Sequence, residues 1–332
     1  MFLRRSVMLR LLYFNTMSFI NNKLQRFLKF VVLVVSLVVI YFQFKSRVVS
    51  FSDFNLLLEK LSSVKALFFL VITFLLMLLN WSLESYKWKY LLNKVEDVSF
   101  YQAVKGVLSG LAIGFITPNR VGEFAGKIAY LKSENRTNGA VMSFVGSSSQ
   151  LLITIQAGLI AIGVSKFKSP IDVFVTPIAL VTLVIVSIVW FKLDLFLKWI
   201  SRFAWLQKWN KHTDQLAYVS EKKMTTVYFL SLVRYLVFPI QYFVLFKMLD
   251  TTITFSECLS MTAISYFLLA IVPTYAIAEI GARGSINLLV FSHLNAPFAV
   301  LAASLLIWII NLIIPALIGL FLMAKFKFQN ND

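Results

Sequence analysis

Six stretches of this chain are apolar over a length that can cross a lipid bilayer. A membrane-spanning helix needs about 20 consecutive, mostly apolar residues. The chain is 59% apolar and only 14% charged, whereas ordinary soluble domains are about 45–50% apolar and about 25% charged. The sequence therefore predicts an all-α polytopic membrane protein, with spans at residues 27–44, 65–83, 137–163, 171–191, 225–249 and 297–324.

Two further apolar stretches, 103–117 and 258–272, are short, and each runs into a charged motif. Each motif has a proline, then a glutamate, then a cation four residues after the glutamate. A charge at the bilayer centre costs roughly 2.5–3.5 kcal/mol, so two matching motifs indicate a polar site between related halves. Such interrupted segments are typical of re-entrant hairpins. The motifs read Thr117-Pro118-Asn119-Arg120-Val121-Gly122-Glu123-Phe124-Ala125-Gly126-Lys127 and Val272-Pro273-Thr274-Tyr275-Ala276-Ile277-Ala278-Glu279-Ile280-Gly281-Ala282-Arg283.

Positive charges indicate how the chain is threaded, because cytoplasmic loops collect Lys and Arg. The N-terminal segment, the 192–223 connection and the C-terminal tail are all basic. If residues 103–133 crossed the membrane once, the 192–223 connection would lie outside the cell. All three segments are cytoplasmic only if 103–133 enters the membrane and returns to the same side. This threading leaves the basic loop 45–65 outside. We therefore expect about six full spans and two re-entrant hairpins in the cell membrane. The hairpins enter from opposite leaflets, and both termini are cytoplasmic.

The two hairpins also indicate an internal repeat. Residues 98–118 align without gaps to 253–273, and the glutamates and cations align after one inserted residue. Entry from opposite leaflets would make this an inverted repeat, as in many transporters. We expect a single transmembrane domain, 27–324, with repeat halves at about 65–163 and 225–324.

The segments outside the two halves have separate roles. Span 171–191 joins the halves together with residues 194–220, where tryptophans and basic residues recur at helical spacing. This pattern predicts a helix lying in the cytoplasmic interface against anionic headgroups, with a solvated linker as the alternative. Residues 1–26 form an N-terminal cytoplasmic segment, in which Met17 is an alternative start, and 325–332 form a cytoplasmic tail.

Arg234 lies about nine residues into the span that starts near Thr225, roughly 14 Å deep at 1.5 Å per residue. The planar guanidinium of arginine suits phosphate and carboxylate groups. Arg234 is therefore predicted to form a cationic path for a lipid phosphate with the motif cations Arg120, Lys127 and Arg283. The motif carboxylates, Glu123 and Glu279, hold these cations or bind a cationic headgroup or a proton. The alternative is a set of internal salt bridges without a transport role, which would pair Glu123 with Lys127 and Glu279 with Arg283, each four residues apart.

Polar residues also recur within the two helices that follow the hairpins. Polar side chains inside a span face other helices or a wet cavity. A cavity lining and plain helix packing both fit this pattern. The predicted cavity-lining residues are Ser147, Gln150, Thr154 and Asn311.

Two other patterns in the first half have simpler interpretations. Residues 81–90 include two tryptophans, two tyrosines and two lysines, which predicts an interface belt with snorkelling lysines. Glycines recur at intervals of four near the first hairpin and allow close backbone approach. They are Gly106, Gly110, Gly114, Gly122 and Gly126.

Several classes of function are disfavoured. Cys258 is the single cysteine, which excludes an intrachain disulfide, and the two histidines have no ligand-type spacing, so no metal site is predicted. The chain has no GxxxxGK[ST] motif for ATP and no visible nucleophile–base constellation, so we expect neither a cofactor nor a self-sufficient enzyme. The formal charge of +17 points to membrane headgroups rather than nucleic acid.

The stretch Gly114-Phe115-Ile116-Thr117-Pro118-Asn119-Arg120-Val121-Gly122-Glu123 resembles the signature of the flippase-like integral-membrane family. That family includes the transmembrane region of lysylphosphatidylglycerol synthases, and the resemblance runs from about residue 30 to 324. It implies movement of a polar lipid between leaflets. The second motif departs from the common glycine-rich form after Pro273. No aminoacyl-transfer domain follows, so we do not expect the synthase itself.

The leading hypothesis is a flippase or transporter of a polar or phosphate-bearing lipid. Its predicted partners are membrane lipids and a lipid-modifying enzyme. The second hypothesis is a membrane-embedded transferase, or an accessory subunit of one, in lipid-linked glycan or aminoacyl-lipid synthesis. A scaffold that only assembles partners is the third, although a scaffold has no need of charges deep in the bilayer.

Overall fold

The computed structural model describes residues 62–117, 120–164, 172–191, 220–272 and 276–324, and within these ranges every regular element is helical. The predictions for 1–26, 27–44, 194–220 and 325–332 lie outside the described residues. The helices are α4 (Val64–Leu92), α5 (Phe100–Ile116), α6 (Gly122–Ala129), η3 (Ser133–Asn135), α7 (Arg136–Val164), α8 (Asp172–Phe191), α11 (Glu221–Met248), α12 (Phe255–Ile271), α13 (Ala276–Val290), η6 (Ser292–Leu294), α14 (Pro297–Trp308), η7 (Ile309–Ile313) and α15 (Ile314–Ala324).

Four helical segments in the described part of the chain are long and apolar enough to cross a membrane: Val64–Leu92, Ser133–Val164, Glu221–Met248 and Pro297–Ala324. They coincide with four predicted spans, and α8 forms over the predicted span at 171–191. Large apolar side chains point outward, such as Leu67 and Phe68 at 61% and 62% exposure. Apolar surface outside and charge inside is the pattern expected for a protein in lipid.

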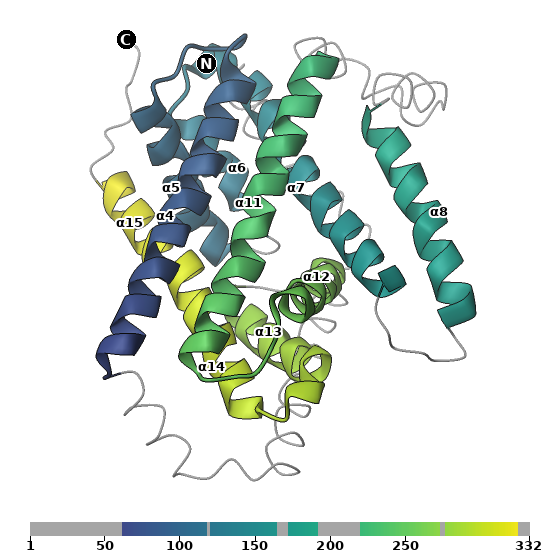
Figure 1. Ribbon diagram of the computed structural model, residues 1–332. Helices are drawn as coiled ribbons and strands as arrows, with labels where there is room; N and C mark the ends of the chain where they lie inside the picture. Colours follow the sequence, from purple (N-terminus) through teal and green to yellow (C-terminus); the bar gives the residue numbers. More distant parts are fainter. Residues whose placement is uncertain (1–61, 118–119, 165–171, 192–219, 273–275, 325–332) are drawn as a thin grey trace, which may run out of the picture.

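Helices α4 and α11 run antiparallel and pack side by side (Figure 1). Lys65 at the start of α4 forms an ion pair with Asp250 just after α11, at 2.6 Å. At the other end, Lys223 Nζ donates to the carbonyl of Leu91 at 2.9 Å. This register places the middle of α11, where Arg234 lies, beside the second half of α4.

Helices α5 and α6 form a hairpin that starts and ends at the same end of α4. The backbone N–H of Lys132 and the amide of Asn135, after α6, both donate to the carboxylate of Glu96, before α5, at 3.1 and 2.8 Å. The hairpin therefore turns back instead of crossing beside α4. Figure 1 shows it at the top of the molecule, near the end of α4.

Helices α12 and α13 form the second hairpin, at the opposite end of the α4–α11 pair (Figure 1). Leu249 and Ile253, which precede α12, share an apolar cluster with Phe291, which follows α13. The entrance and exit of this hairpin are therefore neighbours as well. The two hairpins approach the middle of the molecule from opposite ends.

The first helices of the two hairpins match in detail. Both α5 and α12 have 17 residues, and both begin with a capping box, Ser99 with Gln102 and Thr254 with Glu257. In this motif the side chain of the cap and the side chain three residues later satisfy each other's backbone N–H groups. Packing is also reciprocal, since α5 packs on α15 of the second half and α12 packs on α7 of the first. These matches support the internal repeat.

Glycines bring α5 and α6 into backbone contact, as their spacing predicted. A Cβ atom built on Gly126 would lie 2.3 Å from the Cα of Gly110. Similarly, a Cβ on Gly319 would overlap the carbonyl of Leu108 where α15 crosses α5. Small residues at these crossings let the helices approach closely enough to place their polar side chains together.

Two apolar clusters occupy the two ends of the helix bundle. One surrounds Tyr242, Phe246 and Phe291, and the other surrounds Trp88 and Leu92. Along both α4 and α11, the segment between these clusters carries the buried charges described next. Two smaller apolar clusters, one around Leu111 and Leu312 and one around Ile153 and Tyr235, lie elsewhere in the core.

Candidate functional site

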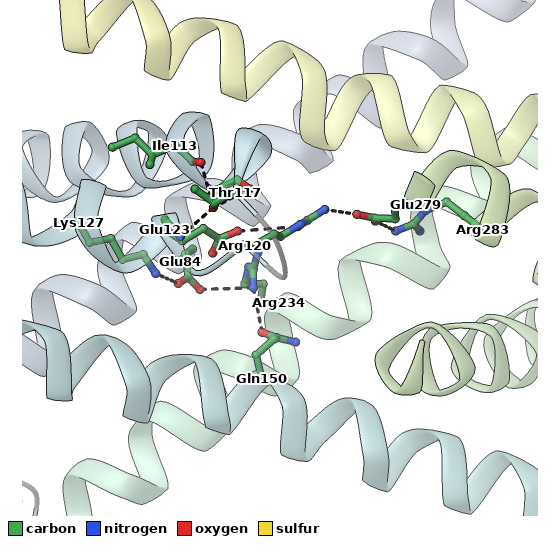
Figure 2. A network of polar contacts seen from close by, with 12 residues as sticks. Glu84, Ile113, Thr117, Arg120, Glu123, Lys127, Gln150, Arg234, Glu279 and Arg283 are labelled. Atoms are coloured by element: carbon green, nitrogen blue, oxygen red, sulfur yellow. Dashed lines mark hydrogen bonds and ion pairs between the residues drawn. The ribbon is translucent and has the colours of Figure 1, made fainter. Parts of the chain in front are cut away.

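Glu84 on α4 is the centre of a buried cluster in which one carboxylate contacts three cations. Its oxygens lie 2.7 Å from Lys87 Nζ, 2.8 Å from Lys127 Nζ and 3.4 Å from Arg234 Nη1. The side chains of Glu84, Lys87 and Lys127 are at most 8% exposed. The cations come from α4, α6 and α11, so this cluster (the Glu84 cluster) joins three helices (Figure 2).

The Glu84 cluster corrects two expectations. The glutamate partner of Lys127 is Glu84 on a neighbouring helix, and not Glu123 four residues earlier. The reason is that close packing of α6 on α5 turns Lys127 toward the interior, whereas Glu123 remains 28% exposed. Lys87 is not a snorkelling interface residue either, because its side chain is buried and its Nζ also donates to the carbonyl of Gly146 on α7 and the hydroxyl of Ser231 on α11, at 3.3 and 3.4 Å.

Arg234 points into the protein interior, as its depth in the sequence predicted. Its Nε donates to the Asn80 side-chain oxygen at 2.7 Å, and its Nη1 donates to the Gln150 side-chain oxygen at 3.1 Å. Its guanidinium also lies over the ring of Trp81, 5.4 Å from the centroid. These contacts, from α4 and α7, hold the guanidinium next to Glu84 (Figure 2).

The two hairpins meet through an ion pair between their inner ends. Arg120 Nη2, just before α6, lies 2.5 Å from Glu279 on α13. Glu279 also accepts a hydrogen bond from Arg283 Nη2 at 2.7 Å, which confirms the predicted pairing of these two motif residues. Glu123 lies 3.9 Å from Arg120. Figure 2 shows Arg120 reaching across to Glu279 from the first hairpin.

The backbone at the inner end of the first hairpin is held by Thr117. Its hydroxyl donates to the carbonyl of Ile113 at 3.1 Å and accepts from the N–H of Gly122 at 2.9 Å. Arg120 has a φ of 56°, in the left-handed region, which costs about 1–2 kcal/mol for a residue other than glycine. This conformation persists where the surroundings fix it, and here the ion pair to Glu279 is one such constraint.

A pocket of about 110 Å³ lies between the hairpin ends. Its lining includes three of the site arginines and one carboxylate, together with aromatic and amide side chains. The lining residues are Trp81, Arg120, Arg234, Phe238, Tyr266, Glu279, Arg283, Ile307, Trp308, Asn311 and Leu312. The pocket is therefore built from both repeat halves and from both hairpins.

Of the four predicted cavity-lining residues, Asn311 lines the pocket, whereas Ser147, Gln150 and Thr154 are not among its lining residues. Gln150 instead accepts a hydrogen bond from Arg234, which does line the pocket. Thr154 donates to the carbonyl of Gln150 within its own helix. The three α7 residues do share one helical face, but Gln150 is the one whose side chain contacts Arg234.

A π-helical turn, η7, places Asn311. The amide of Asn311 donates to the Gln241 side chain at 3.0 Å and to the carbonyl of Ile307 at 3.2 Å. Such turns break the regular helix register and are frequent at functional sites. The turn therefore presents the polar amide of Asn311 from an otherwise apolar helix.

Sequence reasoning missed the centre of the site. Glu84 was overlooked because it lies within the aromatic and basic stretch 81–90, which has the composition of an interface belt. The available signal was the spacing of Asn80, Glu84 and Lys87 at intervals of four and three, which places them on one face of a helix. Trp308 shared the spacing of Asn311, but a role for it was not predicted.

The site as a whole has more positive than negative charge. Five cations, Arg120, Arg234, Arg283, Lys87 and Lys127, surround three carboxylates. Unit charges 4 Å apart interact by about 4 kcal/mol at an effective dielectric constant of 20. An anionic ligand would therefore be attracted to this site. Among the described residues, no group of three or more His, Cys, Asp or Glu could hold a metal ion.

Comparison with known proteins gives the family. Residues 28–319 match the family described as the lysylphosphatidylglycerol synthase transmembrane region. No curated protein matches the chain. The match covers three of the membrane-length helical segments, most of the fourth (Pro297–Ala324), both hairpins and every residue of the site. The chain therefore belongs to the lysylphosphatidylglycerol synthase transmembrane-region family, a membrane protein family with a lipid-related role.

Proposed function

We propose that this protein moves a phosphate-bearing lipid between the two leaflets of the cell membrane. The observation that carries the proposal is the excess of buried cations where the two hairpins meet. Burying charge is costly, and an excess of one sign is costlier still unless a ligand of opposite charge completes it. A lipid phosphate has that charge, and arginine forks bind it well.

In this proposal both hairpins are re-entrant and enter the membrane from opposite leaflets. The geometry that supports it is the return of each hairpin to the end of the bundle where it began. The basic 192–223 connection and both termini are assigned to the cytoplasm by the distribution of Lys and Arg. The first hairpin then opens to the inner leaflet and the second to the outer leaflet, which is the arrangement of an inverted repeat.

The ion pair between Arg120 and Glu279 joins the two hairpins across the path. Glu279 contacts two arginines, Arg120 and Arg283. A phosphate that reaches the pocket competes with Glu279 for Arg120 and so weakens the contact between the hairpins. The headgroup can then pass from one hairpin to the other, while the acyl chains stay in the bilayer beside the exposed apolar surfaces of the outer helices.

The Glu84 cluster has a different part in this proposal. Its carboxylate contacts cations from three helices at once, and its side chain is almost fully buried. It therefore fixes the positions of Lys127 and Arg234 relative to the pocket. Arg234, at its edge, is the cation shared by the cluster and the pocket.

The test is leaflet exchange in liposomes that contain the purified protein. Fluorescent derivatives of anionic, zwitterionic and uncharged lipids are each incorporated, and an impermeant quencher reports the fraction in the outer leaflet over time. We expect phosphate-bearing lipids to exchange faster than in protein-free vesicles, and diacylglycerol to show no acceleration. Equal rates with and without protein for every phospholipid contradict the proposal. A chemically altered lipid after incubation favours the membrane-embedded transferase instead.

A further inference from the structure

The pocket between the hairpins contains hydrogen-bond donors that no described residue accepts. The indole nitrogens of Trp81 and Trp308 are buried without a partner, and so are Nε and Nη1 of Arg283. All three residues line the pocket. Buried donors normally have acceptors, because losing their hydrogen bonds to water is unfavourable. Four unpaired donors around one pocket therefore point to a ligand that supplies acceptors.

The donors are held in place by the surrounding protein. Arg283 and Trp308 are each only 9% exposed. The Nη2 of Arg283 donates to Glu279, and the guanidinium lies over the ring of Tyr266, 5.1 Å from its centroid. Its Nε and Nη1 are buried and have no acceptor. The ring of Trp308 packs against Phe115. A donor that is already positioned loses little conformational entropy when a ligand arrives.

Unpaired donors outnumber unpaired acceptors in this pocket. The side-chain oxygen of Asn311 is an acceptor without a partner, and the hydroxyl of Tyr266, beside the Arg283 guanidinium, can donate or accept. Indole and guanidinium groups can only donate. The ligand must therefore present several acceptor atoms and at most one or two donors. It must also be small enough for a pocket of about 110 Å³.

We infer that this pocket is a phosphate-binding subsite, in which Trp81, Trp308 and Arg283 donate hydrogen bonds to the oxygens of a phosphate group. This inference rests on the proposed function and names the part of the lipid that the site recognises. A phosphate has acceptor oxygens on every side and a negative charge that suits Arg120, Arg234 and Arg283 in the pocket wall. The phosphate can belong to a lipid headgroup or be free phosphate.

Binding can be measured without transport, on the full chain in detergent, by isothermal titration calorimetry. The probes are dihexanoyl phosphatidic acid, inorganic phosphate and dihexanoylglycerol, which has no phosphate. We expect saturable binding of dihexanoyl phosphatidic acid and none of dihexanoylglycerol. Trp308→Phe keeps an aromatic ring but removes the donor, and it should weaken binding roughly tenfold, because hydrogen bonds to charged groups are the stronger ones. Trp81→Phe should have a similar effect.

Trp190 provides the matched control. Its indole nitrogen is also buried without a partner, but Trp190 lies in the apolar cluster with Trp88, away from the pocket. Trp190→Phe should leave the affinity unchanged. A melting curve for each variant separates loss of the donor from loss of the fold, and Trp81→Phe serves if Trp308→Phe does not fold.

Each result of these binding measurements either supports or overturns the phosphate-binding subsite. Binding of phosphatidic acid alone supports the inference with a lipid source, and binding of inorganic phosphate as well supports it with either source. Absence of phosphate-dependent binding, or equal affinity in the wild type and both pocket variants, overturns it. If phosphate binds but vesicles show no leaflet exchange, the subsite stands and the proposed transport fails. If exchange occurs without this binding, the transport stands and the subsite is wrong.

Discussion

At the scale of single residues, Glu84 contributes most to the electrostatics of the site. Three cations share this one carboxylate, and they come from three different helices. Removing one partner of a buried ion pair usually costs more than the pair contributes, because it leaves the other charge unsolvated. Here the removal of the Glu84 carboxylate would take a partner from three cations at once.

Glu84→Gln should therefore be strongly destabilising. We expect the free energy of unfolding to fall by about 3–5 kcal/mol, the usual cost of breaking a buried ion pair, as measured by thermal unfolding in detergent. Glu134→Gln is the control, because Glu134 is exposed in the short helix before α7. An unfolding temperature for Glu84→Gln equal to that of the control would show that the three cations do not depend on Glu84.

At the scale of helices, backbone contact between α5 and α6 determines where the first motif points. The face of α6 that carries Gly122 and Gly126 packs directly on α5. This contact turns Lys127 toward Glu84 and leaves Glu123 near Arg120. The glycines therefore act on the site through the position of the helix that carries the charges.

Gly126→Ala should disturb the first hairpin, because the added Cβ would lie 2.3 Å from the Cα of Gly110, where no side chain can move aside. Overpacking of this kind costs about 1–3 kcal/mol, and we expect a lower unfolding temperature. Gly146→Ala on α7 is the matched control, since its nearest neighbour is the end of the Leu91 side chain at 3.0 Å. If the two variants melted alike, backbone contact would not control this hairpin.

At the scale of the whole molecule, the two hairpins lie at opposite ends of one bundle. Helices α5 and α12 share length and capping, and each packs on the last long helix of the other half. Their hairpins meet at the Arg120–Glu279 ion pair. The position of the pocket between the halves follows from this exchange of contacts.

Labelling of single cysteines tests this arrangement. Cys258 is the only cysteine, so Cys258→Ala supplies the background, and exposed residues supply the probes. Asp97→Cys and Glu134→Cys flank the first hairpin and should be labelled from the same side of the membrane, the cytoplasmic one. Thr252→Cys, before the second hairpin, should be labelled from outside. Labelling of Asp97→Cys and Glu134→Cys from opposite sides would mean that the first hairpin crosses the membrane.

Much of the fold could be predicted from the sequence, because spans and hairpins follow from local hydropathy and charge. Arg120, Arg234, Glu279 and Arg283 were found because a charge in an apolar stretch is conspicuous. The ion-pair partners of these residues were harder to predict. Lys127 pairs with Glu84 because of the way α6 packs on α5, and the spacing of residues along one helix does not show how two helices pack. Ser147 and Thr154 lie on the same face of α7 as Gln150. Of these three, Gln150 contacts a pocket residue, Arg234, through its side chain, and none of the three lines the pocket.

The most direct measurement of the central claim is leaflet exchange by Glu279→Gln. This change keeps the size of the side chain but removes the charge that joins Arg120 and Arg283. In liposomes with a fluorescent phosphatidylglycerol, we expect the wild type and Glu134→Gln to accelerate exchange equally. Glu279→Gln should be slower by at least tenfold, because without this carboxylate Arg120 and Arg283 are no longer held in place, and nothing competes with a bound phosphate for Arg120 to release it. A tenfold lower rate corresponds to about 1.4 kcal/mol. Wild-type exchange in a well-folded Glu279→Gln protein would contradict a transport path between the hairpins.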